Sequence, residues 1–117
     1  MWPFIFMKFT DSLKKNTDFR QVYRKGRYKS DRFIVLYVLP NDRDMNRLGI
    51  SVSKKVGNSV VRHHLCRLVR ESYRLHELSV SKGYDLVTVL RTNAKDADFH
   101  QIEASLLFLL KYHGLLE

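Results

Sequence analysis

Basic and histidine side chains recur at helical spacing between residues 51 and 74, and these are the side chains of the sequence best suited to chemistry. At about 100° per residue, one helix face collects His63, Arg67, Arg70 and Arg74. The acid nearest to them is Glu71, which lies at the edge of that face, so we expect no carboxylate to neutralise the arginines. Such a face repels itself unless an outside anion compensates its charge.

The segment before this helix adds a second source of positive charge. Lys54 and Lys55 precede Gly57, which we expect in a left-handed turn, and Asn58 or Ser59, either of which can cap the helix. The positive end of the helix dipole would then lie beside two lysines. This arrangement is a suitable seat for a phosphate group.

The opposite helix face is predicted to be buried, because apolar or small residues repeat there at intervals of four and three. These residues are Val61, Leu65, Leu68, Ser72 and Leu75. Two interpretations of the cationic face stay open. Most charge runs are solvated surface helices, but a cluster of one sign that combines a loop, a helix start and a helix face favours nucleic-acid binding.

The whole chain is strongly basic, with 117 residues and a formal net charge of +9. This length suits one domain with a single core, and the charge points to nucleic acid or an anionic membrane surface as the partner. Cys66 is the only cysteine, so no internal disulfide can form, and we expect a reducing, cytoplasmic location.

The N-terminal segment MWPFIFM is apolar. A membrane span takes about 20 residues, so this segment is too short to cross a bilayer or to form a typical signal core. We expect residues 1–12 to be an extension that is mobile or docked, and residues 13–117 to form the domain. Met7 is an alternative to Met1 as the start of the chain.

A first short helix is expected from Asn16 or Thr17, either of which can cap it, to Gly26. It places Phe19 and Tyr23 on one face, where periodicity alone favours packing in the core. Strands are then predicted over residues 27–30, 32–40 and 47–53, and another over 84–91 after the basic helix. A last helix, capped by Asp96 or Asp98, buries a stripe formed by Phe99, Ile102, Leu106, Leu109 and Leu110.

The resulting order α-β-β-β-α-β-α predicts a single α/β (α+β) domain, a two-layer sandwich of one sheet with helices packed on it. In the strand over 47–53, Leu48, Ile50 and Val52 alternate with Gly49, Ser51 and Ser53. The small residues leave room for nucleotides on their face, with Tyr37 nearby for stacking. An ordinary solvated sheet face explains the same pattern.

Other chemistries have weaker support in the sequence. It contains no Walker loop, dinucleotide fingerprint or serine-hydrolase elbow. A nuclease that used His63 and His64 would need both imidazoles at one phosphate, whereas consecutive helical residues point about 100° apart. A zinc site from His63, Cys66 and His76 lacks paired ligand spacing. Cys66 is most simply a small neutral residue.

From about Leu13 onward, the chain resembles the protein subunit of bacterial ribonuclease P. The segments that carry the resemblance are LKKNTDFRQVYRKG, FIVLY, RLGISVSKKVGNSVVR, RLVRE and YDLVTVLR. It implies a ribosomal-protein-S5-domain-2-like fold with a left-handed βαβ crossover, where general rules predict a right-handed one. It also implies a non-catalytic protein, one per RNA and away from membranes, which assists a catalytic RNA in removing the 5′ leader of precursor tRNA. Mg²⁺ then acts through the RNA, with none bound tightly by the protein.

The resemblance also implies which residues bind. The catalytic RNA would be contacted by Lys54, Lys55, Asn58, Arg62, His63, His64, Arg67, Arg70 and Arg74. His63, His64 and Cys66 stand where the family usually has Asn, Arg and Lys, so two permanent charges are missing, and Arg74 is a candidate replacement.

The leader of precursor tRNA would lie in a cleft formed by Phe19, Tyr23, Tyr37 and Ser51, where stacking tolerates any base sequence. No protein residue is given a catalytic or metal-binding role. Two other classes of function stay open: a stand-alone RNA-binding module of the ribosome-associated type, and a protein-only nuclease that uses His63 or His64.

Overall fold

The fold is built on one mixed β-sheet, and the computed structural model that shows it describes residues 9–116. In chain order the elements are β1 (Thr10–Ser12), α1 (Asn16–Lys25), β2 (Arg27–Ser30), β3 (Ile34–Pro40), β4 (Asn46–Ser51), α2 (Ser59–His76), a 3-10 turn (Glu77–Ser79), β5 (Tyr84–Leu90), a second 3-10 turn (Thr92–Asp96) and α3 (Phe99–Tyr112). The predicted helices and strands are all present, which confirms the α+β class.

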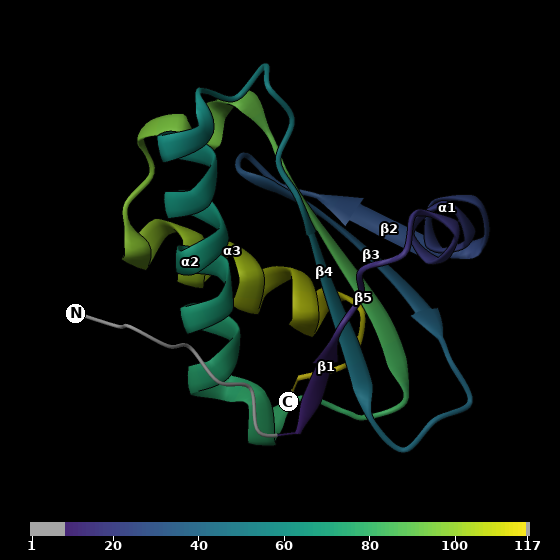
Figure 1. Ribbon diagram of the computed structural model, residues 1–117. Helices are drawn as coiled ribbons and strands as arrows, with labels where there is room; N and C mark the ends of the chain where they lie inside the picture. The colour runs from purple at the N-terminus through teal and green to yellow at the C-terminus, as the bar shows by residue number, and fades with distance from the viewer. Residues whose placement is uncertain (1–8, 117) are drawn as a thin grey trace.

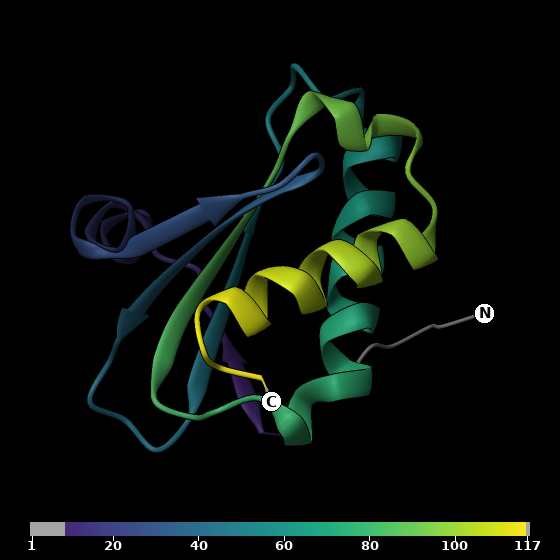
Figure 2. The same cartoon turned by 180° about the vertical axis from the view of Figure 1, so that it is seen from behind.

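The five strands lie in the order β1-β4-β5-β3-β2. Strands β1, β4 and β5 are parallel, whereas β3 runs antiparallel to both of its neighbours. Helix α1 lies on one face of the sheet, and α2 and α3 lie on the other (Figures 1 and 2). The crossover from β4 through α2 to β5 joins adjacent parallel strands, and its handedness stays a prediction from the resemblance.

Most of the core lies between the sheet and the pair α2 and α3. Helix α3 begins with a capping box, in which Asp98 Oδ1 accepts the Gln101 N–H at 2.8 Å, as predicted for Asp98. Its predicted stripe is buried at Ile102, Leu106, Leu109 and Leu110. A smaller cluster of Leu13, Val22 and Val87 lies under α1 on the other sheet face. Of the helices in residues 9–116, none is long and apolar enough to cross a bilayer.

Strand β1 was not predicted, because three residues carry too little pattern to be recognised. Thr10 to Ser12 pair in parallel with Asn46 to Leu48 of β4, although residues 1–12 were predicted to be an extension. The Thr10 hydroxyl lies 2.9 Å from the Tyr73 hydroxyl, so this strand is also tied to α2. The choice between Met1 and Met7 lies outside the described residues.

The buried stripe of α2 differs from the predicted one in its second half. Leu65 and Ser72 are buried as predicted. Val69 and Tyr73 are also buried, although the predicted stripe did not include them. Leu75, predicted to be buried, is 52% exposed. The helix turns its last part toward β1, where the Tyr73 hydroxyl sits between Thr10 and Asn46. The unpredicted burial of Tyr73 is thus accompanied by a contact with the missed strand.

Candidate nucleic-acid interface

Helix α2 starts as predicted at Asn58, whose Oδ1 accepts the Val61 N–H at 3.0 Å. Lys54 and Lys55 before it are exposed, and the first turn contains no acid. Gly57 does not take the predicted left-handed turn, because the only glycines with positive φ in residues 9–116 are Gly83 and Gly114. Glycine is needed there for space, since an added Cβ would lie 2.8 Å from Cβ of Val61.

The predicted cationic face of α2 is exposed to solvent at Arg67 and Arg70. Arg62 is half-buried and donates from Nε to the Gly57 carbonyl at 3.3 Å, which holds the loop against the helix. Together with the two loop lysines these side chains form one surface, which we call the cationic surface. It consists of Lys54, Lys55, Arg62, Arg67 and Arg70.

Arg74, the last arginine of the predicted cationic face, is paired with an acid on its own helix. Its Nε lies 2.5 Å from Glu71 Oε1, one turn back on the same helix, and this hydrogen bond raises the pKa of the Arg74 guanidinium. The expectation that no carboxylate neutralises the arginines is therefore wrong at Arg74. The reason is that Glu71, placed at the edge of the face by its angle, is within i,i+3 reach of Arg74.

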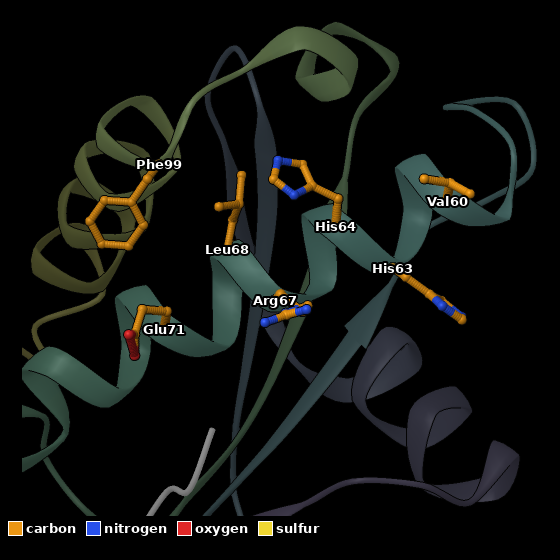
Figure 3. Close-up of a pocket in the computed structure, with 7 residues that line it drawn as sticks. All are labelled: Val60, His63, His64, Arg67, Leu68, Glu71 and Phe99. Carbon is orange, nitrogen blue, oxygen red and sulfur yellow. The ribbon is translucent and has the colours of Figure 1, made fainter. Parts of the chain in front are cut away.

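A hollow of about 680 Å³ separates α2 from the start of α3. Both His63 and His64 line it together with Arg67 and Phe99, but the two imidazoles point to different sides of α2 (Figure 3). A single phosphate cannot therefore lie between them as a general acid and a general base would require. This geometry does not favour the nuclease hypothesis.

Neither the thiol nor a metal cluster offers other chemistry at this face. Burial raises the pKa of the Cys66 thiol, although the nearby Arg70 and Arg62 act in the opposite direction. The protonated thiol is a weak nucleophile. No group of three histidine, cysteine, aspartate or glutamate side chains in residues 9–116 is arranged to hold a metal ion. The three side chains considered for a zinc site, His63, Cys66 and His76, therefore do not form one.

Aromatic rings form a continuous line on the other face of the sheet, beginning on α1. The Phe19 and Tyr23 centroids are 6.3 Å apart, those of Tyr23 and Tyr37 are 5.0 Å apart, and those of Tyr37 and Tyr28 are 5.3 Å apart. We call these four side chains the aromatic track. Three of them were predicted from the sequence. Tyr28 was not, because only the strand register, which pairs it with Tyr37, reveals its position.

Phe19 has two roles in this arrangement. A Cβ added at Gly49 would lie 2.7 Å from Cζ of Phe19, so the space that we expected Gly49 to leave for a nucleotide is occupied by this ring. Phe19 also packs against the small cluster of Leu13, Val22 and Val87. Periodicity predicted that both rings pack in the core. Phe19 does so while remaining half-buried, whereas Tyr23 is 39% exposed.

A row of small and apolar side chains runs across the sheet beside the aromatic track. The strand register places Ser51 opposite Val89, Val89 opposite Val35, and Val35 opposite Ser30. None of these residues is buried, although two are valines. The predicted site residue Ser51 lies at the end of this row, three residues before Lys54, so the row leads toward the cationic surface.

An ion-pair network fixes α1 over the sheet. Arg47 of β4 contacts Asp85 of β5 at 2.6 Å and Asp18 of α1 at 3.3 Å. Burial tends to raise the pKa of Asp85, but hydrogen bonds from Arg47 and Asn41 outweigh it and the pKa is lowered. The carboxylate therefore stays ionised near neutral pH. An ion pair thus adds to the packing that places α1, and with it the aromatic track, over the sheet.

The sequence and the fold match one family. The family model for ribonuclease P matches residues 7–114, so the match includes part of the segment predicted to be an extension. The ribonuclease P protein component of Clostridium botulinum strain Langeland is 48% identical over 106 residues, covering 90% of this chain and 96% of that protein. The same component from Alkaliphilus metalliredigens is 45% identical over 110 residues, covering 94% of this chain and 99% of that protein.

Solved structures agree with these relatives. The ribonuclease P protein of Staphylococcus aureus has a TM-score of 0.84 and 38% identity, and the match covers 91% of this chain and 97% of that one. The protein from Thermotoga maritima has a TM-score of 0.81 and 31% identity, covering 87% of this chain and 96% of that one. This chain therefore belongs to the ribonuclease P protein family.

Proposed function

We propose that the chain is the protein subunit of a ribonuclease P ribonucleoprotein and binds two RNAs at the same time. The cationic surface, with Asn58, His63 and His64, holds the catalytic RNA, and Arg74 adds to it only in part because of Glu71. The aromatic track and Ser51 hold the 5′ leader of precursor tRNA. Cleavage and its Mg²⁺ belong to the RNA, one protein binds each RNA, and the complex acts in the cytoplasm.

The observation that carries this proposal is the half-exposed row of Ser51, Val89, Val35 and Ser30 beside a line of aromatic rings. Apolar side chains left open next to rings suit the flat faces of unpaired bases, and stacking on a ring contributes roughly 1–3 kcal/mol per base. Phosphate contacts from the cationic surface position RNA without reading its sequence. Both surfaces therefore suit a protein that accepts many different precursors.

The first test separates three classes of function. Purified protein is incubated with precursor tRNA and Mg²⁺, with and without the cognate large RNA. We expect cleavage at low Mg²⁺ to be stimulated only when the protein and the large RNA are both present. Cleavage by protein alone would instead identify a nuclease, and binding with no effect on cleavage would identify a stand-alone RNA-binding module.

The second test addresses the leader and uses Tyr23→Ala. Phe19→Ala should also weaken precursor binding, but it removes a ring from the packed cluster, whereas Tyr23 is 39% exposed and can be removed with little loss of stability. In the assembled complex, Tyr23→Ala should weaken binding of precursor tRNA by roughly 1–3 kcal/mol and leave mature tRNA binding unchanged. Equal effects on both would place the leader elsewhere.

A suitable control is Tyr112→Ala. Tyr112 is 58% exposed and lies on α3, which packs on the sheet face opposite α1 (Figure 2). Its ring contacts Lys29 there, whose side chain points away from the aromatic track. This variant loses the same side chain from a similar degree of exposure, so it should not change the preference for precursor over mature tRNA.

A further inference from the structure

Tyr28 of the edge strand β2 is 61% exposed, which no contribution to a core explains. The ring is nevertheless held in place, because its centroid lies 5.3 Å from that of Tyr37 and their planes meet at 67°. The two residues are direct cross-strand partners, and side chains at such positions contact one another. Tyr28 is thus an exposed aromatic side chain with a fixed neighbour.

The strand register places a hollow next to these rings. Ser30 and Val35 form the next cross-strand pair on the same face, since side chains alternate along a strand. A hollow of about 380 Å³ lies at these rings and is lined by Tyr28, Tyr37, Ser30, Val35 and Lys29. Its size lies within the range of roughly 300–1,000 Å³ found for small-ligand sites.

The side chains around the hollow indicate what it accepts. Side chains alternate along a strand, so Arg27 and Lys29 point to the opposite sheet face, where Lys29 Nζ lies 4.9 Å from the ring centroid of Tyr112. The hollow itself offers two aromatic rings beside a serine and a valine, and such a surface suits the flat face of an unpaired base. The hollow is also continuous with the aromatic track, of which Tyr28 is the outermost member.

We propose that the hollow between Tyr28 and Tyr37 is an additional base-stacking site for single-stranded RNA, which extends the leader contact to the edge of the sheet at β2. This inference rests on the proposed function, because it assumes that the leader lies along the aromatic track. It adds one residue, Tyr28, and one position for a base to the contacts described above.

The test measures Kd of the assembled complex, containing the cognate large RNA, for precursor tRNAs whose leaders are shortened one nucleotide at a time. We expect Tyr28→Ala to weaken binding of long-leader precursors about fivefold or more. The effect should vanish once the leader is too short to reach β2. Tyr28→Phe should bind like the unmodified protein, because it keeps the ring, and Tyr112→Ala should show no dependence on leader length.

Each other outcome overturns the inference in a recognisable way. If Tyr23→Ala weakens long-leader binding and Tyr28→Ala does not, the leader uses the track but stops before β2. If neither variant shows a leader effect, the proposed leader cleft itself fails. If Tyr28→Phe loses as much as Tyr28→Ala, a hydroxyl contact and not stacking is responsible. If Tyr112→Ala has the same effect, the loss is not specific to the hollow.

Discussion

Replacing three arginines of the cationic surface should change how salt affects binding of the large RNA. Each phosphate neutralised makes the slope of the log association constant against log salt concentration more negative by about 0.7 to 0.9. Arg67 and Arg70 are exposed and Arg62 is half-buried, so all three can reach a phosphate. The triple change of Arg62, Arg67 and Arg70 to Gln should therefore flatten the slope by about two to three units.

The size of this effect makes it easy to measure. Between about 50 and 200 mM salt, these three contacts account for a roughly 20- to 40-fold loss of affinity, which the triple variant should no longer show. Binding is measured by titration of labelled RNA at several salt concentrations and constant Mg²⁺. Glutamine keeps much of the apolar stem, so packing is little disturbed, and urea unfolding of each variant checks this.

Arg74→Gln is the internal control, because Glu71 already pairs with this guanidinium. It should change the slope much less than Arg70→Gln does. If Arg62, Arg67, Arg70 and Arg74 each bound one phosphate equally, the slope would be near −3 or slightly steeper, and each single variant would flatten it by the same amount. A slope that the triple variant leaves unchanged, or equal effects of Arg74→Gln and Arg70→Gln, would refute the assignment of this surface.

Two further predictions concern the scaffold. Asp85→Asn should lower the free energy of unfolding by about 2–3 kcal/mol, because Arg47 loses its 2.6 Å partner, whereas Asp18→Asn, at 3.3 Å and more exposed, should cost less than about 1 kcal/mol; urea unfolding that gives equal losses would contradict this. Burial lowers the pKa of His113, whose Nε2 lies 3.2 Å from the Leu36 carbonyl, so its neutral form is favoured in the folded state. Stability from this group should be complete above the unfolded pKa of about 6.5 and be lost as pH falls through the lower folded value. Unfolding curves at pH 7.5 and pH 5 should therefore diverge less for His113→Gln than for the unmodified protein, and an equal or larger divergence would show that His113 is not the group involved.

Periodicity predicted the long elements well. In a helix such as α3, the apolar residues repeat at helical spacing because one face is buried along its whole length. It failed where a side chain is explained by a partner distant in sequence. Tyr73 is buried because β1 reaches it, and Tyr28 matters because β2 pairs it with Tyr37. Neither pairing leaves a local pattern in the sequence, so both needed the structure.

The resemblance predicted which residues bind RNA, and the structure changes how the charges of these residues are distributed. Arg74 was the candidate to replace charge lost at His64 and Cys66, and its pairing with Glu71 makes it a poor substitute. The chain still carries a net charge of +9, so positive charge must lie elsewhere.

Part of that charge lies on α1, where Arg20 and Arg24 are exposed on either side of Tyr23 at helical spacing. Cations beside a stacking ring attract the phosphates of the strand whose bases stack there. If the leader lies along the aromatic track as proposed, these two arginines should add to the salt dependence of precursor binding. The salt slope for precursor binding by the assembled complex and the slope for assembly of the complex are therefore separate predictions, and we expect only the second to depend mainly on α2.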